Sequence, residues 1–113
     1  MKLVTAYIQP DKLSTVKEAL RKAEILKMSV SNALGSPPKG VREEYDGRGK
    51  SKSGLLKKVR LEIAVNDEYL KPTVKAIIKG AKSGKIGDGK IFITELYECV
   101  RIRTEETGSD AIG

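Results

Sequence analysis

The stretch from residue 58 to residue 65 reads KVRLEIAV and is the clearest strand in the chain. Apolar residues alternate along it with polar or small ones, the two-residue period expected of a strand. A helix-start signal follows at Asn66-Asp67, and apolar residues then recur at helical spacing from Leu70 to Ala81. A further strand is predicted over residues 91–100. This half of the chain therefore reads strand, helix, strand.

The first half repeats the same order. Residues 2–9 alternate with apolar residues on both faces, which predicts a central strand. Pro10-Asp11 then starts a helix, and a strand over residues 28–35 ends at Gly35. The order predicts an α+β, ferredoxin-like βαββαβ fold (a split βαβ). Its four-stranded antiparallel sheet would carry two helices on one face, and oligomerisation would cover the other.

Composition sets further limits on the 113 residues, which we take as one domain. Histidine is absent and Cys99 is the single cysteine, so we expect no metal site, no catalytic residues and a reducing, cytoplasmic location. No apolar run is long enough to span a membrane, and the first residues lack a signal peptide. The net charge is +7, and residues 39–60 hold eight basic and three acidic residues.

A glycine-rich run, SGKIGDGKIF, occupies residues 83–92. Three glycines in six residues allow a close backbone approach to a ligand, and nearby lysines supply positive charge, as a phosphate cradle requires. The run is a near miss to a Walker A loop, but Ile91 stands where serine or threonine would hold magnesium. Arg101-Ile102-Arg103-Thr104 follows one strand length later and is expected to add charge around the same concavity.

The two motifs and the element order resemble the PII signal-transduction proteins, the trimeric nitrogen-regulatory family. The resemblance covers residues 1–104. It makes residues 36–54 the T-loop that docks on targets, residues 82–90 the B-loop, and residues 101–113 the C-loop and tail. We expect that tail to be mobile from Thr104 onward.

The resemblance implies an adenine nucleotide between neighbouring subunits of a homotrimer. Six residues would hold its phosphates: Gly87, Asp88, Gly89, Lys90, Arg101 and Arg103. Four would line the base and ribose from the adjoining subunit: Ser29, Gly35, Glu62 and Ala64. Lys58, which pairs with a dicarboxylate in the family, is retained and could take a smaller anion. No prosthetic group is expected.

The T-loop departs from the family pattern. Its uridylylation stretch ends in Lys50 instead of tyrosine, so uridylylation is predicted to be lost. The magnesium-binding glutamine is missing at the base of the loop, where Pro37 and Pro38 also lack N–H donors. We therefore expect weak or absent 2-oxoglutarate sensing, comparatively good binding of ADP or AMP beside ATP, and a doubtful dependence on Mg²⁺.

The leading interpretation is a regulator, not an enzyme, whose T-loop engages a membrane transporter or a metabolic enzyme. The leading candidates for this target are an ammonium channel and a nitrogen-assimilation enzyme. The alternative is a regulator of inorganic-carbon uptake or fixation that binds ADP or AMP and bicarbonate. A remote alternative, RNA binding on the open sheet, is disfavoured because the strand over residues 55–65 has no aromatic residue for base stacking. Neither nucleic-acid binding nor membrane insertion is expected.

Overall fold

The computed structural model describes residues 1–37 and 54–113. Most of the T-loop, including Pro38, Tyr45 and Lys50, lies outside these residues. The elements are β1 (Lys2–Ile8), the 3-10 turn η1 (Pro10–Lys12), α1 (Leu13–Lys22), β2 (Ser29–Gly35), β3 (Leu56–Val65), the 3-10 turn η2 (Asp67–Tyr69), α2 (Leu70–Ala81), β4 (Gly89–Glu95) and α3 (Ser109–Ile112).

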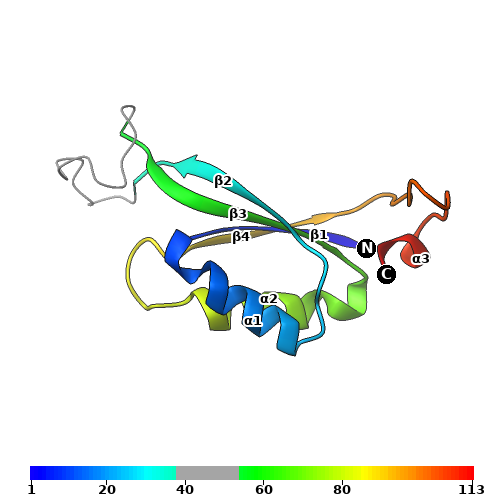
Figure 1. The fold of residues 1–113 in the computed structure, drawn as a ribbon, viewed down its shortest axis with the longest axis horizontal. Coiled ribbons are helices and arrows are strands. Elements are labelled where there is room, and N and C mark those ends of the chain that lie inside the picture. The colour runs from blue at the N-terminus through cyan, green and yellow to red at the C-terminus, as the bar shows by residue number, and fades with distance from the viewer. Residues whose placement is uncertain (38–53) are drawn as a thin grey trace.

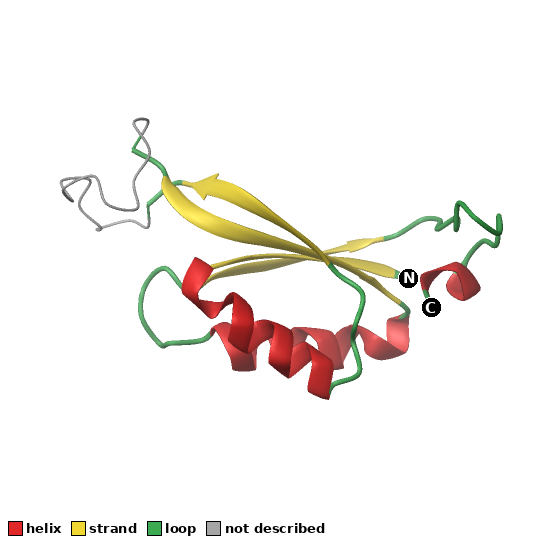
Figure 2. Cartoon of the chain, viewed as in Figure 1, coloured by secondary structure: helices red, strands yellow, loops and turns green. Residues whose placement is uncertain are grey.

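The four strands form one antiparallel sheet in the order β2-β3-β1-β4, and α1 and α2 lie together on one of its faces (Figures 1 and 2). This is the predicted βαββαβ arrangement, and β1 is central as its two apolar faces indicated. Each long helix begins directly after a 3-10 turn, and the predicted start at Pro10 falls on the first of them.

The core lies between the helices and the sheet. Every second residue of β1 is buried against them (Val4, Ala6 and Ile8), and the alternation predicted for residues 58–65 places Leu61 and Ile63 on the same side. Leu20 of α1 and Ile77 of α2 are fully buried opposite these strands. Burial of branched aliphatic side chains at this two-residue period explains why the strands hold their register.

The β4 edge of the sheet leaves apolar side chains exposed. Phe92 is 52% exposed and Ile93 47%, and Ile78 of α2, which lies near Ile93, is 48% exposed. Ile93 and Ile78 line one shallow apolar hollow together with Leu70 and Val74. An edge strand with this composition is a place where another chain can pair or pack, which agrees with the expectation that copies of the chain assemble.

Two expectations about the ends of elements were wrong. The last strand stops at Glu95, which pairs with Lys2, and not at residue 100. The tail is not loose, since residues 109–112 form α3 and contact the rest of the chain. The helix start predicted at Asn66-Asp67 falls on η2, which Asn66 precedes as the N-cap residue. The Asn66 side chain makes no capping bond there, and its Nδ2 donates to the Ser109 carbonyl at 3.2 Å.

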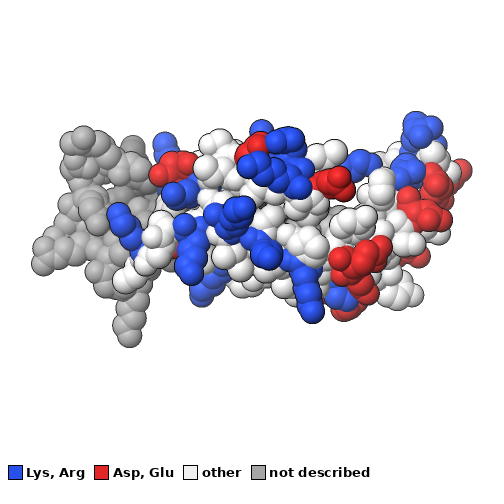
Figure 3. Space-filling view, turned by 90° about the horizontal axis from the view of Figure 1, so that it is seen from below, with Lys and Arg blue, Asp and Glu red and all other residues white. Residues whose placement is uncertain are grey.

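Charge is unevenly distributed over the surface. Figure 3 shows lysine and arginine spread across the helical face, with acidic side chains gathered toward the end that carries the C-terminal residues. Within the described residues, no helix is long and apolar enough to cross a membrane.

Candidate functional site

The loop between α2 and β4 is shaped by Asp88. Its carboxylate accepts hydrogen bonds from the Ser83 N–H (2.9 Å), the Ser83 hydroxyl (2.5 Å) and the Gly84 N–H (2.9 Å). These bonds, that of the Ser83 side chain first, hold the pKa of Asp88 below its usual value. Asp88 was predicted to hold phosphate. The structure shows its carboxylate hydrogen-bonded inside the loop instead, an arrangement that suits a negatively charged side chain beside a negatively charged phosphate.

The loop leaves backbone donors available. Gly84, Gly87 and Gly89 have φ values of +86°, +103° and +111°, which only glycine adopts at little cost. Among the residues that the structure describes, the N–H groups of Ile86 and Gly87 have no hydrogen-bond partner. Unpaired N–H groups in a tight loop beside lysines form a concavity suited to phosphate oxygens. As the sequence indicated, a strand and not a helix follows.

The Gly87 carbonyl ties this loop to the sheet. It accepts a hydrogen bond from the Gln9 amide at 2.7 Å and one from the Lys58 ammonium at 3.1 Å. The Lys58 side chain is largely buried, with 8% of the residue exposed. Sequence reasoning missed Gln9, because its place opposite Gly87 depends on how the end of β1 meets the loop, and no motif marks it.

A cavity of about 630 Å³ opens between this loop and the ends of β2 and β3. Its lining includes the predicted site residues Gly35, Lys58, Gly87, Gly89 and Lys90, and it also includes Ser36 and Pro37 at the base of the T-loop. Tyr7 and Phe92 form another wall, with their rings edge to face and 6.2 Å between centroids. The structure thus brings five of the predicted residues to one hollow.

Two predicted base-lining residues face each other across the outer strand pair. Ser29 of β2 is paired in register with Glu62 of β3. The Glu62 carboxylate forms an ion pair with Arg60, with 2.5 Å between Nη2 and Oε2. Ala64, two residues further along β3, lines a different cavity of about 280 Å³ with Lys27, Ile112 and Gly113.

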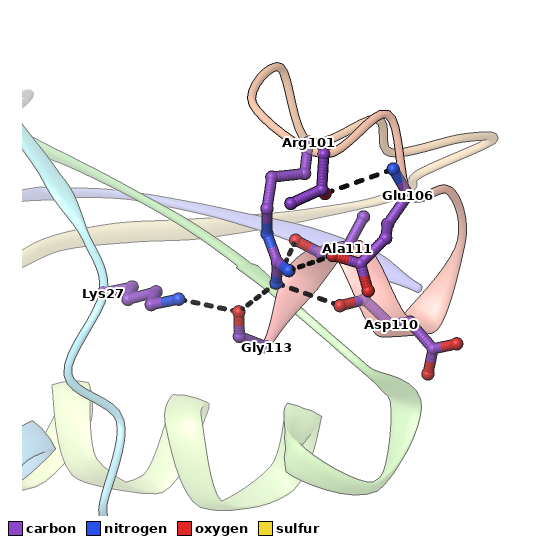
Figure 4. A network of polar contacts seen from close by, with 7 residues as sticks. Lys27, Arg101, Glu106, Asp110, Ala111 and Gly113 are labelled. Carbon is purple, nitrogen blue, oxygen red and sulfur yellow. Dashed lines mark hydrogen bonds and ion pairs between the residues drawn. The ribbon is translucent and has the colours of Figure 1, made fainter.

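Arg101 lies at the other end of the molecule, where its Nη1 and Nη2 groups bond to other residues (Figure 4). Its guanidinium contacts Glu106 at 2.6 Å and donates to the carbonyls of Asp110, Ala111 and Gly113 at 3.0, 3.4 and 2.7 Å. Arg101 contributes to holding the pKa of Glu106 below its usual value, after a hydrogen bond from Thr104. Arg103 is exposed.

One chain therefore does not bring the two motifs together. Gly89 pairs with Ile8 at one end of β1, whereas Glu95 pairs with Lys2 at the other. A seven-residue strand spans about 20 Å, and the segment that follows β4 in the chain lies beyond its far end (Figure 1). The expectation of a single concavity is wrong for one chain, so Arg101 and Arg103 can reach a ligand at Lys90 only from another copy.

Metal binding has little basis in the described residues, which contain no group of three His, Cys, Asp or Glu side chains that could hold an ion. Glu62 and Asp88 are each committed to partners in the chain.

Several known proteins are similar to this chain over nearly its whole length. The chain is 46% identical to the nitrogen regulatory protein GlnK1 of Methanosarcina mazei, over 99% of this chain and 97% of that protein. It is 47% identical to the nitrogen regulatory protein P-II 1 of Methanothermobacter thermautotrophicus, with the same coverage. Its fold matches that of Arabidopsis thaliana PII bound to citrate with a TM-score of 0.81 at 31% identity, over 98% of this chain and 88% of that one. The family model described as nitrogen regulatory protein P-II matches residues 1–106, and the chain thus belongs to the PII family of regulatory signal-transduction proteins, which are not enzymes.

Proposed function

We propose that this protein is a homotrimeric regulator that binds ATP, ADP or AMP between its subunits and controls a nitrogen-metabolism target through residues 36–54. PII proteins are trimeric, bind adenine nucleotides and 2-oxoglutarate, and interact with targets such as channels and enzymes. The names of its curated relatives favour nitrogen over inorganic carbon. A cytoplasmic location is part of this proposal.

The observation that carries the proposal is the loop organised by Asp88. Among the described residues the N–H groups of Ile86 and Gly87 have no partner, and the cavity beside the loop is lined by Lys58 and Lys90. Backbone donors and ammonium groups around one hollow suit a di- or triphosphate, because each bond to a charged oxygen is stronger than a neutral one. Gly87, Gly89 and Lys90 are the residues that would hold the phosphates, with Asp88 shaping the loop around them.

The second half of the site would come from a neighbouring subunit. Arg101 and Arg103 are too distant to contribute within one chain, and the apolar β4 edge supplies a surface on which another copy can pack. The base and ribose would contact residues that lie along β2 and β3: Ser29, Gly35, Glu62 and Ala64.

Sensing of 2-oxoglutarate is expected to be weak. Pro37 lines the cavity but has no N–H to donate. The segment at the base of the T-loop has no glutamine that could hold magnesium. The Lys58 ammonium already donates to the Gly87 carbonyl. Each lost hydrogen bond to a charged group is worth about 1.5–3 kcal/mol, so the combined loss corresponds to about a hundredfold or more in affinity. A small anion such as bicarbonate could still pair with Lys58, which keeps the inorganic-carbon alternative open to test.

Titration calorimetry tests the proposal. We expect ATP, ADP and AMP to bind the full chain, and 2-oxoglutarate to bind weakly or not at all with Mg-ATP present. Lys90→Ala should weaken nucleotide binding by about tenfold or more. Lys79→Ala, which removes an exposed lysine on α2, should leave binding unchanged.

Three results would go against the proposal in different ways. Failure of all three nucleotides to bind would overturn the nucleotide site. Tight binding of 2-oxoglutarate that requires Mg-ATP would instead overturn the loss of dicarboxylate sensing. Bicarbonate binding that disappears in Lys58→Gln would shift the function toward inorganic carbon.

A further inference from the structure

The C-terminal segment, residues 106–113, makes more of its polar contacts with Arg101 than with any other residue. Arg101 contacts the Glu106 carboxylate and the carbonyls of three residues in or just after α3 (Figure 4). A guanidinium has five N–H donors in a fixed fork, and no acceptor. The Nη1 and Nη2 donors that a phosphate would use are therefore already bonded to acceptors within the same chain.

A second cation reaches the same place. Lys27, in the connection between α1 and β2, donates from Nζ to the Gly113 carbonyl at 2.7 Å, the distance at which Arg101 also reaches that oxygen. Two cations from separate parts of the chain thus converge on one oxygen of Gly113. Asn66 fastens the start of α3 by donating to the Ser109 carbonyl.

The segment also covers a second predicted nucleotide-binding residue. Ile112 and Gly113 line the cavity of about 280 Å³ that contains Ala64 and Lys27. Arg101 was expected to hold phosphate and Ala64 to line the base or ribose. Both therefore lie against residues 106–113.

We propose that residues 106–113 occupy the Arg101 and Ala64 part of the nucleotide site and that adenine nucleotides bind in competition with them. This inference rests on the proposed function, since it takes Arg101 and Ala64 as nucleotide-binding residues. The C-terminal segment then acts as a built-in competitor, and its release accompanies binding.

The chemistry favours displacement by a phosphate. Peptide carbonyls are neutral acceptors, whereas phosphate oxygens are charged and can accept two parallel bonds from one guanidinium. The segment is easily released because α3 has four residues and none of its side chains is fully buried. Glu106, its one charged partner to Arg101, is exposed, where an ion pair contributes little.

Competition has a measurable size. When only a fraction of molecules has the site free, the apparent dissociation constant rises by the inverse of that fraction. A segment that is docked in nine molecules of ten would weaken nucleotide binding about tenfold. The effect should reach every adenine nucleotide, because the same residues are covered for each.

The test compares ADP binding by calorimetry in the full chain, in a chain ending at Glu105, which lacks all of residues 106–113, and in Asn66→Ala. We expect the shortened chain to bind ADP about tenfold more tightly. Asn66→Ala should bind it more tightly by a smaller factor, because it loses one anchor of α3. Lys79→Ala is the matched surface control.

Amide exchange gives a readout that needs no shortened chain. The Ala111 N–H donates to the Gly108 carbonyl at 3.0 Å, and its exchange should accelerate when ADP is added to the full chain. Equal ADP affinity in all three proteins, or slower exchange at Ala111 with ADP, would overturn the competition while leaving the nucleotide site in place. Absence of ADP binding in every variant would overturn the nucleotide site and the competition together.

Discussion

Gly89→Ala is expected to destabilise the protein by about 3 kcal/mol and to abolish nucleotide binding. A Cβ at this position would lie 1.8 Å from the Tyr7 carbonyl oxygen and 2.9 Å from its carbon, and both are backbone atoms of the central strand. The φ of +111° adds strain for any residue with a side chain. Relief would require β4 to move away from β1 at the point where the phosphate-binding loop joins the sheet.

Urea unfolding of Gly89→Ala measures this loss, and Gly84→Ala is the matched control. Gly84 also has a positive φ, +86°, but no atom lies within 4 Å of the position that a Cβ would take there. Its substitution should cost only about 1–2 kcal/mol, the conformational part alone. Equal losses in the two variants would show that the contact with Tyr7 does not matter.

Gly80→Ala is expected to destabilise the protein by about 2 kcal/mol, through the contact between the two long helices. A Cβ on Gly80 would lie 2.5 Å from Val16 Cα, 2.7 Å from Val16 N and 2.8 Å from the Thr15 carbonyl oxygen. Alanine favours a helix over glycine by about 1 kcal/mol. Overpacking against backbone atoms costs about 3 kcal/mol. Because this cost is the larger of the two effects, the substitution should destabilise the protein.

The helix contact at Gly80 is also held by a hydrogen bond, since Thr15 Oγ1 donates to the Gly80 carbonyl at 2.7 Å. Separation of the helices would stretch that bond. Thermal unfolding should show a lowered melting temperature for Gly80→Ala and almost no change for Lys79→Ala, which removes an exposed side chain one residue away. A melting temperature for Gly80→Ala at or above that of the unmodified protein would contradict the close approach.

Much of the fold could be predicted because the alternation in β1 and β3 is regular. A strand with apolar residues on both faces must be central, and the order of elements then leaves few arrangements of the sheet. The end of β4 could not be predicted from its own sequence, because it depends on the pairing with β1, in which Glu95 lies opposite Lys2. The tail was misjudged for a related reason: its stability comes from polar contacts with Arg101, Lys27 and Asn66, which lie outside it in the chain.

The site was predictable to the extent that its motifs have fixed spacing. The glycine run identified Gly87, Gly89 and Lys90, and the structure gathers them with Gly35 and Lys58 around one cavity. Gln9 carried no signal, because its contact with the Gly87 carbonyl arises from the meeting of two segments 78 residues apart. The separation of Lys90 from Arg101 could not be seen either, since it depends on the direction of β4.

The loss of uridylylation stays a prediction. Tyr45 and Lys50, on which it depends, lie outside the described residues.

The central claim is that each nucleotide site is shared between two subunits, and subunit mixing tests it most directly. One variant, Lys90→Ala, lacks the loop half of the site; the other, Arg101→Ala with Arg103→Ala, lacks the arginine half. Each homotrimer should bind ADP at least about tenfold more weakly than the unmodified protein. After the two are unfolded together and refolded at equal concentration, about a quarter of the sites should combine two intact halves and recover full affinity. Mixed trimers that recover no tight site would contradict the account.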